Sequence, residues 1–473
     1  MTTIRFGTDG WRAGIAEDYT FANVRLITQG VADYLHAHGL AERGMIVGYD
    51  SRFRSDDFAR AVAEVLAGNG IKSYVCNAPT PTPVSSYAIL DRKTAGGINI
   101  TASHNPYTDN GYKLRSEYGG AAAPEVLTEV EGRIKAVSEV RSLPLDEATA
   151  KGLSEPFDPA PPYIAHISTL VDIGRLRGAG MHVALDPMWG VGVGWFPRLI
   201  GGGCTRLTAI HDGQNPNFPD MHRPEPIPPN LDRLERTVRE IGASVGVAND
   251  GDADRLGIVD EQGRFINQLQ VYALLALYLL EVRGWRGPLV KTVTTTMMAR
   301  KLGQIYNVPV YETGVGFKFV APKMLETNAI MGGEESGGFA FRGHLPERDG
   351  ILAGLFFLDL MVQKNMSPSQ LLADLFSKVG PHYYDRIDTH LDPDEKAAIM
   401  ERVRNARPAT VDGLPVTEID TSDGFRYILG DQGWLLIRFS GTEAVLRVYT
   451  ETTEKDKVQS ILDAGLKIAG VEK

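Results

Sequence analysis

The chain is organised around the stretch Ala95-Gly96-Gly97-Ile98-Asn99-Ile100-Thr101-Ala102-Ser103-His104-Asn105-Pro106. Its first half, a glycine pair followed by β-branched residues, predicts a strand that ends near Ile100. Ser103 stands just past that strand, beside a histidine and ahead of a proline that halts regular structure, which predicts a tight loop. Such a serine is either a nucleophile or a turn residue that hydrogen-bonds its own backbone, and the hexapeptide alone favours the turn.

Strands and helices alternate before this loop. Residues 45–50 form a short apolar run that ends in a carboxylate, which predicts a buried strand. Residues 58–66 have helical periodicity, residues 71–76 predict the next strand, and a further helix continues through Leu90. This alternation predicts a layered sheet of βα units, with the Ser103 loop closing the third strand.

The strand that ends in an aspartate recurs along the chain. Residues 182–186 and 243–250 are again apolar runs that end in aspartate. A strand predicted at 288–293 and a helix at 351–363 continue the pattern. We interpret the recurrence as weak repetition of one α/β unit. Prolines crowd residues 153–162, which predicts an extended linker after the first unit.

Beyond residue 381 the pattern changes to charged helices around closely spaced strands. Helices are predicted at 392–404 and 454–468, and strands at 424–429, 434–439 and 444–451. This arrangement is typical of a smaller α+β domain rather than another parallel sheet.

Composition limits the class of protein. The 473 residues are enough for three or four domains at ~150 residues each. The net charge of −10 argues against a general nucleic-acid binder, although a few arginines in a cleft still attract a small anion. Two distant cysteines, Cys76 and Cys204, give neither a disulfide framework nor a metal-binding spacing. The N-terminus lacks a signal-peptide core and the longest apolar run, 271–280, is too short to cross a bilayer, so we expect a cytoplasmic protein.

The strongest local signal is Asp250-Gly251-Asp252-Ala253-Asp254-Arg255. Three carboxylates at alternate positions on a glycine-containing loop can converge on one hard divalent cation, for which we expect Mg²⁺. An EF-hand also begins with this spacing, but Arg255 stands where that loop needs glycine, and the flanks predict strands. The remaining alternative is a solvated acidic turn, in which Arg255 alone does not neutralise three carboxylates that repel one another.

Two glycine-rich loops are candidate ligand sites. Loop 332–338 places Glu334 and Ser336 among glycines, where a carboxylate can accept hydrogen bonds from two sugar hydroxyls. Segment 313–318 offers backbone N–H groups and one cation; its candidate residues are Thr313, Gly314 and Lys318. Each loop alone fits a plain surface loop as well, and the P-loop pattern G-x-x-x-x-G-K-[ST] occurs nowhere in the chain.

The segment 438–443, followed by Arg447, is a candidate phosphate cradle. It joins two guanidinium groups to a Ser-Gly-Thr turn, and hydroxyls, turn amides and bidentate arginines together suit a phosphate. A hairpin with arginines at its edge explains the segment equally well. The candidate residues are Arg438, Ser440, Gly441, Thr442 and Arg447. Lys113 and Lys291 are either anion contacts or lysines that extend along the surface.

These four loops, in this order, resemble the α-D-phosphohexomutase family, which includes phosphoglucomutases and phosphomannomutases. Residues 101–106 are similar to its phosphoserine loop and residues 250–255 to its magnesium loop. Residues 333–337 resemble its sugar-binding loop, and 438–443 with Arg447 its phosphate-binding loop. Segments 6–12 and 49–52 are also similar to family segments near the N-terminus. The resemblance spans essentially the whole chain.

The resemblance implies a fold of class α/β with four domains around a central cleft. Three domains would share one mixed α/β sheet topology and the C-terminal domain would be α+β, which agrees with the repeated strands. The expected domains are 1–155 with the phosphoserine loop, 156–256 with the metal loop, 257–370 with the sugar-binding loop, and 371–473 with the phosphate-binding loop.

The resemblance also implies a role for each site. Ser103 would carry a phosphoryl group and share Mg²⁺ with Asp250, Asp252 and Asp254. Glu334 and Ser336 would hold the 3- and 4-hydroxyls of a sugar, while the cradle residues hold the phosphate that does not react. The residues expected around the reacting phosphate are Arg12, Lys113, His104 and, near the metal, Arg255. Lys113 is preferred to His104 as general base.

The implied reaction interconverts glucose 1-phosphate and glucose 6-phosphate through phosphorylated Ser103 and glucose 1,6-bisphosphate, the activator and intermediate. A hexose phosphate would be the partner, with no nucleic acid and no membrane, and the protein a monomer or homodimer. Glu335 and Gly338 replace the Gln and His of phosphoglucosamine mutases, which disfavours an amino sugar. The alternatives are a phosphomannomutase or dual-specificity enzyme, a metal-dependent phosphatase with a serine nucleophile, and a non-catalytic sugar-phosphate binding protein.

Overall fold

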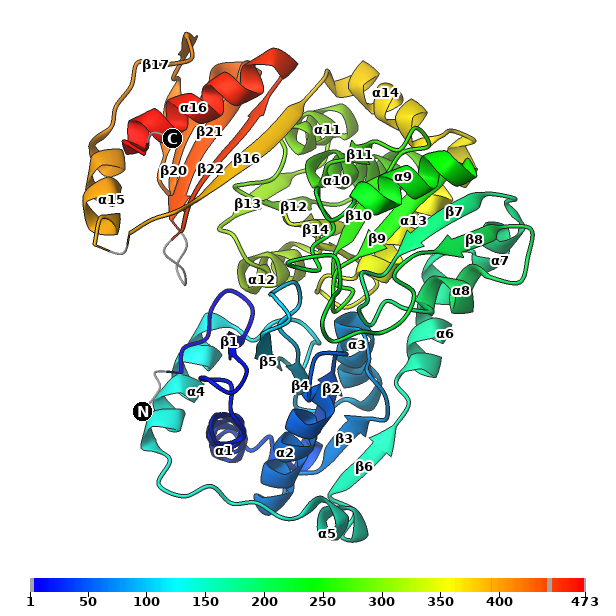
Figure 1. The fold of residues 1–473 in the computed structure, drawn as a ribbon, viewed down its shortest axis with the longest axis vertical. Coiled ribbons are helices and arrows are strands. Elements are labelled where there is room, and N and C mark those ends of the chain that lie inside the picture. The colour runs from blue at the N-terminus through cyan, green and yellow to red at the C-terminus, as the bar shows by residue number, and fades with distance from the viewer. Residues whose placement is uncertain (1–3, 393, 440–444, 472–473) are drawn as a thin grey trace.

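The computed structural model describes residues 4–392, 394–439 and 445–471 and contains four main sheets in chain order (Figure 1). The first three sheets mix parallel and antiparallel strands, whereas the fourth is antiparallel throughout. The expected fold class, three mixed α/β domains and a C-terminal α+β domain, is therefore confirmed.

The first sheet has the strand order β1-β5-β4-β2-β3-β6. Its strands are β1 (Trp11–Gly14), β2 (Met45–Tyr49), β3 (Ser73–Cys76), β4 (Gly97–Ile100), β5 (Asp109–Arg115) and β6 (Ser154–Phe157). Strand β2 is central and parallel to β3 and β4, so the loops after these strands meet at one edge of the sheet. The Ser103 loop, which follows β4, lies at that edge.

Helices that bury one apolar face flank the first sheet. They are α1 (Phe21–Ala37), α2 (Ser55–Gly68), α3 (Thr82–Arg92), α4 (Pro124–Ala136) and α5 (Leu145–Ala150). Thr20 caps α1 by accepting a hydrogen bond from the backbone N–H of Asn23, and Val24, Ile27 and Val31 lie in the core.

The second sheet has the order β11-β10-β9-β7-β8. Its strands are β7 (His182–Asp186), β8 (Arg206–Ala209), β9 (Val245–Asn249), β10 (Leu256–Val259) and β11 (Phe265–Ile266). Its helices are α6 (Ala160–Leu170), α7 (Ile173–Gly178), α8 (Trp195–Ile200) and α9 (Asp232–Ile241). The acidic loop, residues 250–255, joins β9 to β10, which pair antiparallel, so strands flank it as expected and this loop is not an EF-hand.

The third sheet has the order β13-β12-β14-β15. Its strands are β12 (Leu289–Thr292), β13 (Val310–Thr313), β14 (Met331–Gly333) and β15 (Phe339–Phe341). Its helices are α10 (Gln268–Leu277), α11 (Met298–Tyr306), α12 (Phe317–Thr327), α13 (Gly350–Lys364) and α14 (Pro368–Val379). Every residue of α10 is buried, so the longest apolar run is a core helix.

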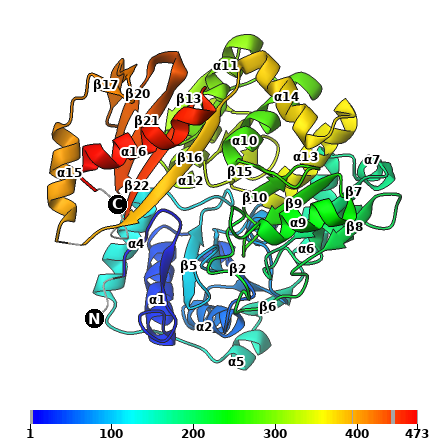
Figure 2. The same cartoon turned by 45° about the horizontal axis from the view of Figure 1, so that its top comes forward.

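The fourth sheet has the order β16-β22-β21-β20-β19. Its strands are β16 (Tyr383–His390), β19 (Glu418–Asp420), β20 (Phe425–Ile428), β21 (Gly433–Phe439) and β22 (Val445–Thr452). A small pair, β17 (Thr410–Val411) and β18 (Leu414–Pro415), and the helices α15 (Lys396–Asn405) and α16 (Val458–Ala469) complete the domain. Figure 2 shows α16 lying across this sheet.

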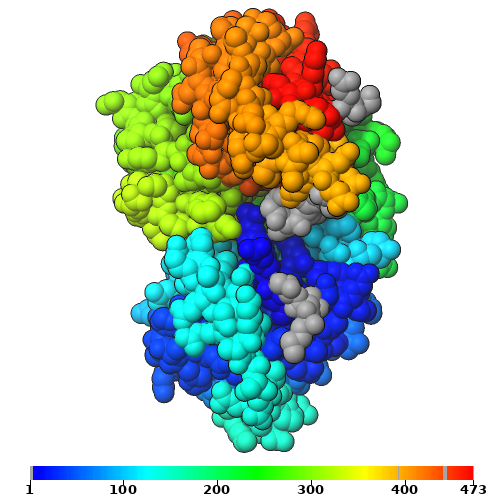
Figure 3. Space-filling view, turned by 90° about the vertical axis from the view of Figure 1, so that its left-hand side faces the viewer, coloured from blue at the N-terminus to red at the C-terminus, as the bar shows by residue number. Residues whose placement is uncertain are grey.

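The second and third domains share one hydrophobic core. A single buried cluster includes Val247 of β9, Leu256 of β10, Tyr272 of α10 and Phe356 of α13. The first and fourth domains have clusters of their own, and a small cluster around Trp434 joins the fourth domain to the third. On the face drawn in Figure 3 the surface is hollowed between the first domain below and the C-terminal domain above.

The proline-rich segment 153–162 is ordered, which corrects the expected extended linker. Strand β6 pairs with β3, and Pro161 and Pro162 lie in the first turn of α6, where proline costs no helical hydrogen bond. The expected domain divisions after residues 155, 256 and 370 fall inside β6, β10 and α14, since these elements run across them. No helix among the described residues is long and apolar enough to span a bilayer.

Candidate active site

The Ser103 loop is held in a strained conformation by its neighbours. Ser103 has φ 53°, in the left-handed region, and its backbone N–H donates to Thr101 Oγ1 at 2.8 Å. Arg52 reaches from the loop after β2 and donates to the Ser103 carbonyl at 2.7 Å. Asp50, the carboxylate that ends the strand run, accepts the Arg52 backbone N–H at 2.9 Å. The aspartate at the end of β2 therefore positions the arginine that holds the serine loop.

The Ser103 hydroxyl contacts the acidic loop of the second domain. Ser103 Oγ donates to Asp250 Oδ2 at 2.9 Å and lies 3.3 Å from His104 Nδ1. Gly251 makes this approach possible, since a Cβ at that position would lie 2.6 Å from the Ser103 carbonyl oxygen. Two loops that are far apart in the sequence, 101–106 and 250–255, thus meet in the folded chain.

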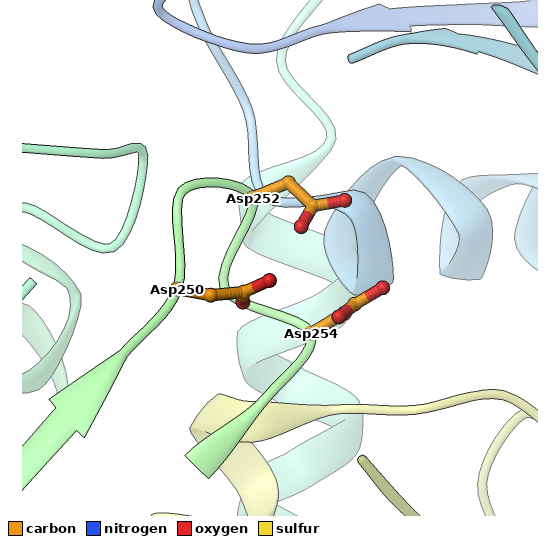
Figure 4. A group of neighbouring side chains, drawn as sticks. All are labelled: Asp250, Asp252 and Asp254. Atoms are coloured by element: carbon orange, nitrogen blue, oxygen red, sulfur yellow. The ribbon is translucent and has the colours of Figure 1, made fainter. Parts of the chain in front are cut away.

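Three buried carboxylates of this loop converge (Figure 4). Asp250, Asp252 and Asp254 each offer an oxygen, and the three oxygens lie within 4.8 Å of one another. Burial and then the two neighbouring carboxylates raise the pKa of Asp250 well above its usual value. Oδ1 of Asp252 and Oδ1 of Asp254 are buried and have no hydrogen-bond partner among the described residues. Orphaned carboxylate oxygens of this kind fit a hard divalent cation.

Lys113 of β5 faces the same carboxylates from the first domain. Its Nζ lies 2.8 Å from Asp252 Oδ2, 2.8 Å from Asp9 Oδ2 and 3.4 Å from Asp254 Oδ2. Burial lowers the pKa of Lys113, but the attraction of these three carboxylates outweighs it and raises the pKa above the ordinary lysine value. Lys113 is therefore a cation in this arrangement.

Arginines surround the serine and its histidine. Arg12 of β1 donates to Asn105 Oδ1 at 2.7 Å, which fixes it on the serine loop. Arg255, at the end of the acidic loop, contacts Glu225 at 2.9 Å. Burial and then the charges of Arg255 and Arg12 lower the pKa of His104 well below its usual value, so the imidazole is neutral.

The glycine-rich loop between β14 and β15 is joined to the acidic loop. Arg255 forms a β-bridge with Gly338, and the Leu256 N–H donates to the Gly337 carbonyl at 2.9 Å. Glu334 is 6% exposed, and its burial, only partly offset by Arg348 and Arg255, raises its pKa to about 7. The candidate sugar-binding residues Glu334 and Ser336 therefore lie on a loop that is anchored to the acidic loop 250–255.

Arg348 is a central residue of the site that sequence reasoning missed. Its guanidinium lies 2.5 Å from Asp9, 3.1 Å from Asp254 and 3.5 Å from Glu334, which belong to three different domains. The available signal was the polar run Glu347-Arg348-Asp349 directly before the apolar helix α13. Nothing in that run alone shows which carboxylates it will meet.

Segment 313–318 lies between the first and fourth domains. Lys318 Nζ is 3.5 Å from the Gly7 carbonyl oxygen of the first domain. Gly316 has φ +125°, and a Cβ there would lie 2.7 Å from Thr8 Cγ2. Thr313 ends β13 and Gly314 follows it, so the candidate binding residues of this segment lie beside contacts to the first and fourth domains.

The remaining candidates lie in or beside the C-terminal domain. Arg438 of β21 contacts Asp423 at 2.9 Å, and Arg447 of β22 contacts Asp388 at 3.5 Å. Ser440, Gly441 and Thr442 lie outside the described residues. Lys291 is 2% exposed and contacts Glu312 at 2.5 Å, so within the described chain it belongs to an ion cluster between the third and fourth domains and not to the group around Ser103.

Comparisons with known proteins agree over the whole chain. Profiles of phosphoglucomutase/phosphomannomutase alpha/beta/alpha domains I, II and III match residues 3–141, 161–263 and 267–379, and the C-terminal domain matches 392–467. A phosphoglucomutase/phosphomannomutase of Thermococcus kodakarensis is 30% identical over 468 residues, which cover 98% of either chain. A protein of Methanothermobacter thermautotrophicus, named a probable phosphoglucosamine mutase, is 31% identical over 462 residues, 96% of this chain and 95% of that one.

A comparison with solved structures supports the same family. The crystal structure of a "putative phosphomannomutase" from Thermus thermophilus matches with a TM-score of 0.87 at 32% identity and covers 99% of both chains. The names of the relatives differ in the hexose phosphate but agree in the type of reaction. The chain belongs to the phosphoglucomutase/phosphomannomutase family of α-D-phosphohexomutases, and it is an isomerase that transfers a phosphoryl group within a hexose phosphate.

Proposed function

We propose that the enzyme interconverts glucose 1-phosphate and glucose 6-phosphate by passing a phosphoryl group through Ser103. The hydrogen bond of 2.9 Å from the Ser103 hydroxyl to Asp250 supports this proposal most strongly. It places a serine on a strained loop directly against a carboxylate cluster that fits a divalent cation, with Lys113 and Arg12 beside it. Phosphoryl transfer depends mainly on positioning and on positive charge around the transferring group, and these residues supply both.

The proposed cycle begins with phosphorylated Ser103. In the first half, the bond from Ser103 Oγ to phosphorus breaks and an oxygen–phosphorus bond forms to the free hydroxyl of a hexose monophosphate. The proton of that hydroxyl ends on Ser103 Oγ, which then donates to Asp250. The bisphosphate turns end to end, and its other phosphoryl group returns to Ser103 by the reverse bond changes. No phosphate is released, which distinguishes this cycle from that of a phosphatase.

The charged groups around Ser103 have separate roles in this proposal. Asp250, Asp252 and Asp254 would hold Mg²⁺, which, when bound, offsets charge on the transferring phosphoryl group. Lys113 approaches the same position from the first domain. The sequence favours Lys113 as general base; because its pKa is raised, it keeps its proton, and we assign it charge stabilisation in the state described here. His104 contacts the Ser103 hydroxyl as a neutral imidazole, and Arg12 and Arg255 add positive charge.

A site for the sugar and a site for the distant phosphate complete the proposal. Glu334 and Ser336 would accept and donate hydrogen bonds at the 3- and 4-hydroxyls, while segment 313–318 supplies N–H groups and the Lys318 cation. Arg438 and Arg447, together with the neighbouring residues 440–442, would hold the phosphate that is not reacting. Lys291, which is engaged with Glu312, is proposed only as a support of this region.

Glucose is the proposed preferred sugar. Glucose and mannose phosphates differ only at C2, and the 3- and 4-hydroxyls assigned to Glu334 and Ser336 are common to both. We therefore expect mannose 1-phosphate to be converted as well, with a lower kcat/KM than glucose 1-phosphate. Rates with the two substrates, and with glucosamine 1-phosphate as a third, measure this preference directly.

Mass spectrometry and a coupled assay test the central proposal. After exposure to glucose 1,6-bisphosphate, peptide mapping should find one added phosphoryl group, on Ser103. Glucose 1-phosphate should become glucose 6-phosphate without release of inorganic phosphate, and Ser103→Ala should lose this activity while remaining folded. Phosphate on another residue, or steady release of phosphate by the native protein, would contradict the mechanism and favour a phosphatase.

The proposed metal site has its own test. Mg²⁺ should raise the melting temperature of the native protein, because a ligand that binds only the folded state stabilises it. Asp252→Asn should remove most of that shift and most of the turnover, while it leaves the melting temperature in EDTA close to that of the native protein. Normal turnover of this variant with Mg²⁺ would exclude the assignment.

We also propose a cytoplasmic enzyme that acts as a monomer or homodimer. Cys76 is buried and Cys204 is exposed, and both are free thiols, which suits a reducing compartment. Light scattering of the purified protein measures the oligomeric state.

A further inference from the structure

Asp423 lies on the turn between β19 and β20 and contacts two of the proposed binding segments. Its Oδ1 accepts a hydrogen bond from Arg438 Nε at 2.9 Å. Its Oδ2 accepts the backbone N–H of Val315 at 2.7 Å. One carboxylate thus joins the arginine of the C-terminal domain to segment 313–318 of the third domain.

The backbone places Asp423 beside Arg438. Gly424 has φ +99°, and a Cβ there would lie 2.9 Å from the Ile437 carbonyl oxygen and 3.3 Å from Arg438 Cβ. The turn can therefore lie directly against β21 only with glycine at position 424. On the other side, a Cβ on Gly314 would lie 3.4 Å from Asp423 Oδ2, so segment 313–318 also approaches closely.

Segment 313–318 is held from its other end by the first domain. Lys318 contacts the Gly7 carbonyl oxygen, and Gly316 lies against Thr8. A continuous line of contacts therefore runs from the loop before β1, through segment 313–318 and Asp423, to Arg438. It joins the first, third and fourth domains.

We infer that Asp423 is a positioning residue, which sets the separation between the phosphate-holding Arg438 and the sugar-side segment 313–318. The inference rests on the proposed function, since it takes Arg438 as a ligand of the distant phosphate. A mutase must hold either end of one bisphosphate at a fixed distance from Ser103, so the spacing of these two elements matters for binding. Asp423 itself touches neither the serine nor the acidic triad among the described residues.

The chemistry of a carboxylate suits this role. Its two oxygens accept from Arg438 and from Val315 at the same time, whereas the amide of asparagine has one acceptor oxygen and one donor nitrogen. Asp423→Asn keeps the shape of the side chain but leaves one of the two N–H groups facing another donor. The arginine and the segment should then separate, and the substrate should bind more weakly.

A matched control is available three residues away. Asp420 lies on the same hairpin and pairs at 2.7 Å with Arg426, which also faces the third domain. The Asp420 and Asp423 side chains are 22% and 23% exposed, so the two substitutions remove a carboxylate from equivalent environments. Arg426 contacts Glu312 and is not part of the proposed phosphate site.

The experiment compares kcat and KM of Asp423→Asn and Asp420→Asn with glucose 1-phosphate. Loss of a charged hydrogen bond predicts a KM for Asp423→Asn that is raised roughly 10- to 100-fold, with kcat changed less than about threefold. Asp420→Asn should change neither constant by more than about threefold. Equal effects of the two variants, or a loss of kcat alone, would overturn the inference.

A double-mutant cycle tests whether Asp423 acts through Arg438. In an Arg438→Met background, Asp423→Asn should raise KM by less than about threefold, because the interaction is already absent. Independent, multiplying effects would refute the positioning role. Absence of mutase activity in the native protein would instead refute the proposed function, so the two failures are distinguishable.

Discussion

At the scale of single residues, burial determines the chemistry of the sugar-binding loop. Glu334 is almost inaccessible, and its nearest cation, Arg348, is shared with Asp9 and Asp254. Its pKa is therefore raised to about 7 by burial, which the attraction of Arg348 and Arg255 offsets only in part. A carboxyl group with this pKa changes its charge across the physiological range.

Substrate binding should follow the charge of Glu334. As the pH falls through 7, Glu334 gains a proton and loses acceptor capacity for sugar hydroxyls, so KM should rise by about tenfold per pH unit below 7. Glu334→Gln should have a high KM that does not vary in this way. Steady-state kinetics between pH 5.5 and 8.5 measure both profiles, and a native KM that is flat across this window would contradict the role.

The charge of Glu334 should also affect the stability of the fold. A fall in pH, which weakens substrate binding, should raise the free energy of unfolding through this group. A carboxyl group whose folded pKa lies above its unfolded value favours the folded state below the unfolded pKa and loses that advantage as the pH rises through the folded pKa. The free energy of unfolding should therefore fall by up to about 3 kcal/mol between pH 4.5 and 8 through this group. At pH 8, Glu334→Gln should unfold at a higher denaturant concentration than the native protein. A lower unfolding midpoint for the variant would show instead that the ion pair between Glu334 and Arg348 stabilises the fold by more than burial of the charge destabilises it.

At the scale of elements, close contact between two loops defines the centre of the site. The loop between β9 and β10 and the loop after β4 meet at Gly251, where a Cβ would lie 2.6 Å from the Ser103 carbonyl oxygen. The nearest atom belongs to the backbone and the next to the ring of Pro224, at 3.2 Å, so no flexible side chain is there to move away. A methyl group at this position must therefore push the serine away from the acidic triad.

Gly251→Ala should reduce both stability and turnover. Overpacking costs ~1–3 kcal/mol, and displacement of Ser103 from Asp250 should lower kcat by at least tenfold. Gly132, in α4, is the control, since a Cβ there meets nothing within 4 Å. Gly132→Ala should stabilise the helix by about 0.5–1 kcal/mol and leave kcat unchanged. Chemical denaturation measures the stability of the two variants and steady-state kinetics measures their kcat. A native kcat in Gly251→Ala would refute the close contact between Gly251 and the Ser103 carbonyl.

The sequence predicts elements better than it predicts the contacts between them. Local apolar runs were sufficient for β2, β7 and β9, and alternate aspartates were sufficient for the acidic loop, because these signals depend only on neighbours in the chain. The roles of Asp50 and Arg348 depend on partners in distant segments, and so no local pattern reveals them. The prolines of 153–162 were misinterpreted for a related reason, since only pairing with β3 shows that part of this segment is a strand.

At the scale of the whole molecule, the domains are joined in unequal ways. The second and third share a continuous apolar core, whereas the fourth meets the third through the small Trp434 cluster and through ion pairs. Glu312 of β13 is central to these pairs, since it contacts Lys291 and Arg426, which are almost fully buried. Burial raises its pKa, but Lys291 and then Arg426 lower it to about 2.

Glu312→Gln should loosen the C-terminal domain. Removal of the carboxylate leaves Lys291 without its counter-charge and leaves Arg426 with Asp420 alone, which should cost about 3 kcal/mol at pH 7. In the native protein this contribution is present above the unfolded pKa and is lost as the pH falls toward 2. Calorimetry should show an earlier C-terminal transition. The control is Glu326→Gln, whose pair with Lys323 is exposed and should be worth less than about 1 kcal/mol; an equal change in both would contradict the cluster.

The shared core of the second and third domains also constrains how such enzymes can diversify. Recombination that exchanged only one of the two would mismatch a continuous apolar interior, so the acidic loop 250–255 and the glycine-rich loop 332–338 should be exchanged together. Replacement of the C-terminal domain would break one small apolar cluster, several ion pairs, and the hydrogen bonds that Thr296 and Met297 donate to Glu451. Under the proposed function, exchange of the last domain alone should therefore change how the distant phosphate is held and leave the sugar-binding residues Glu334 and Ser336 in place.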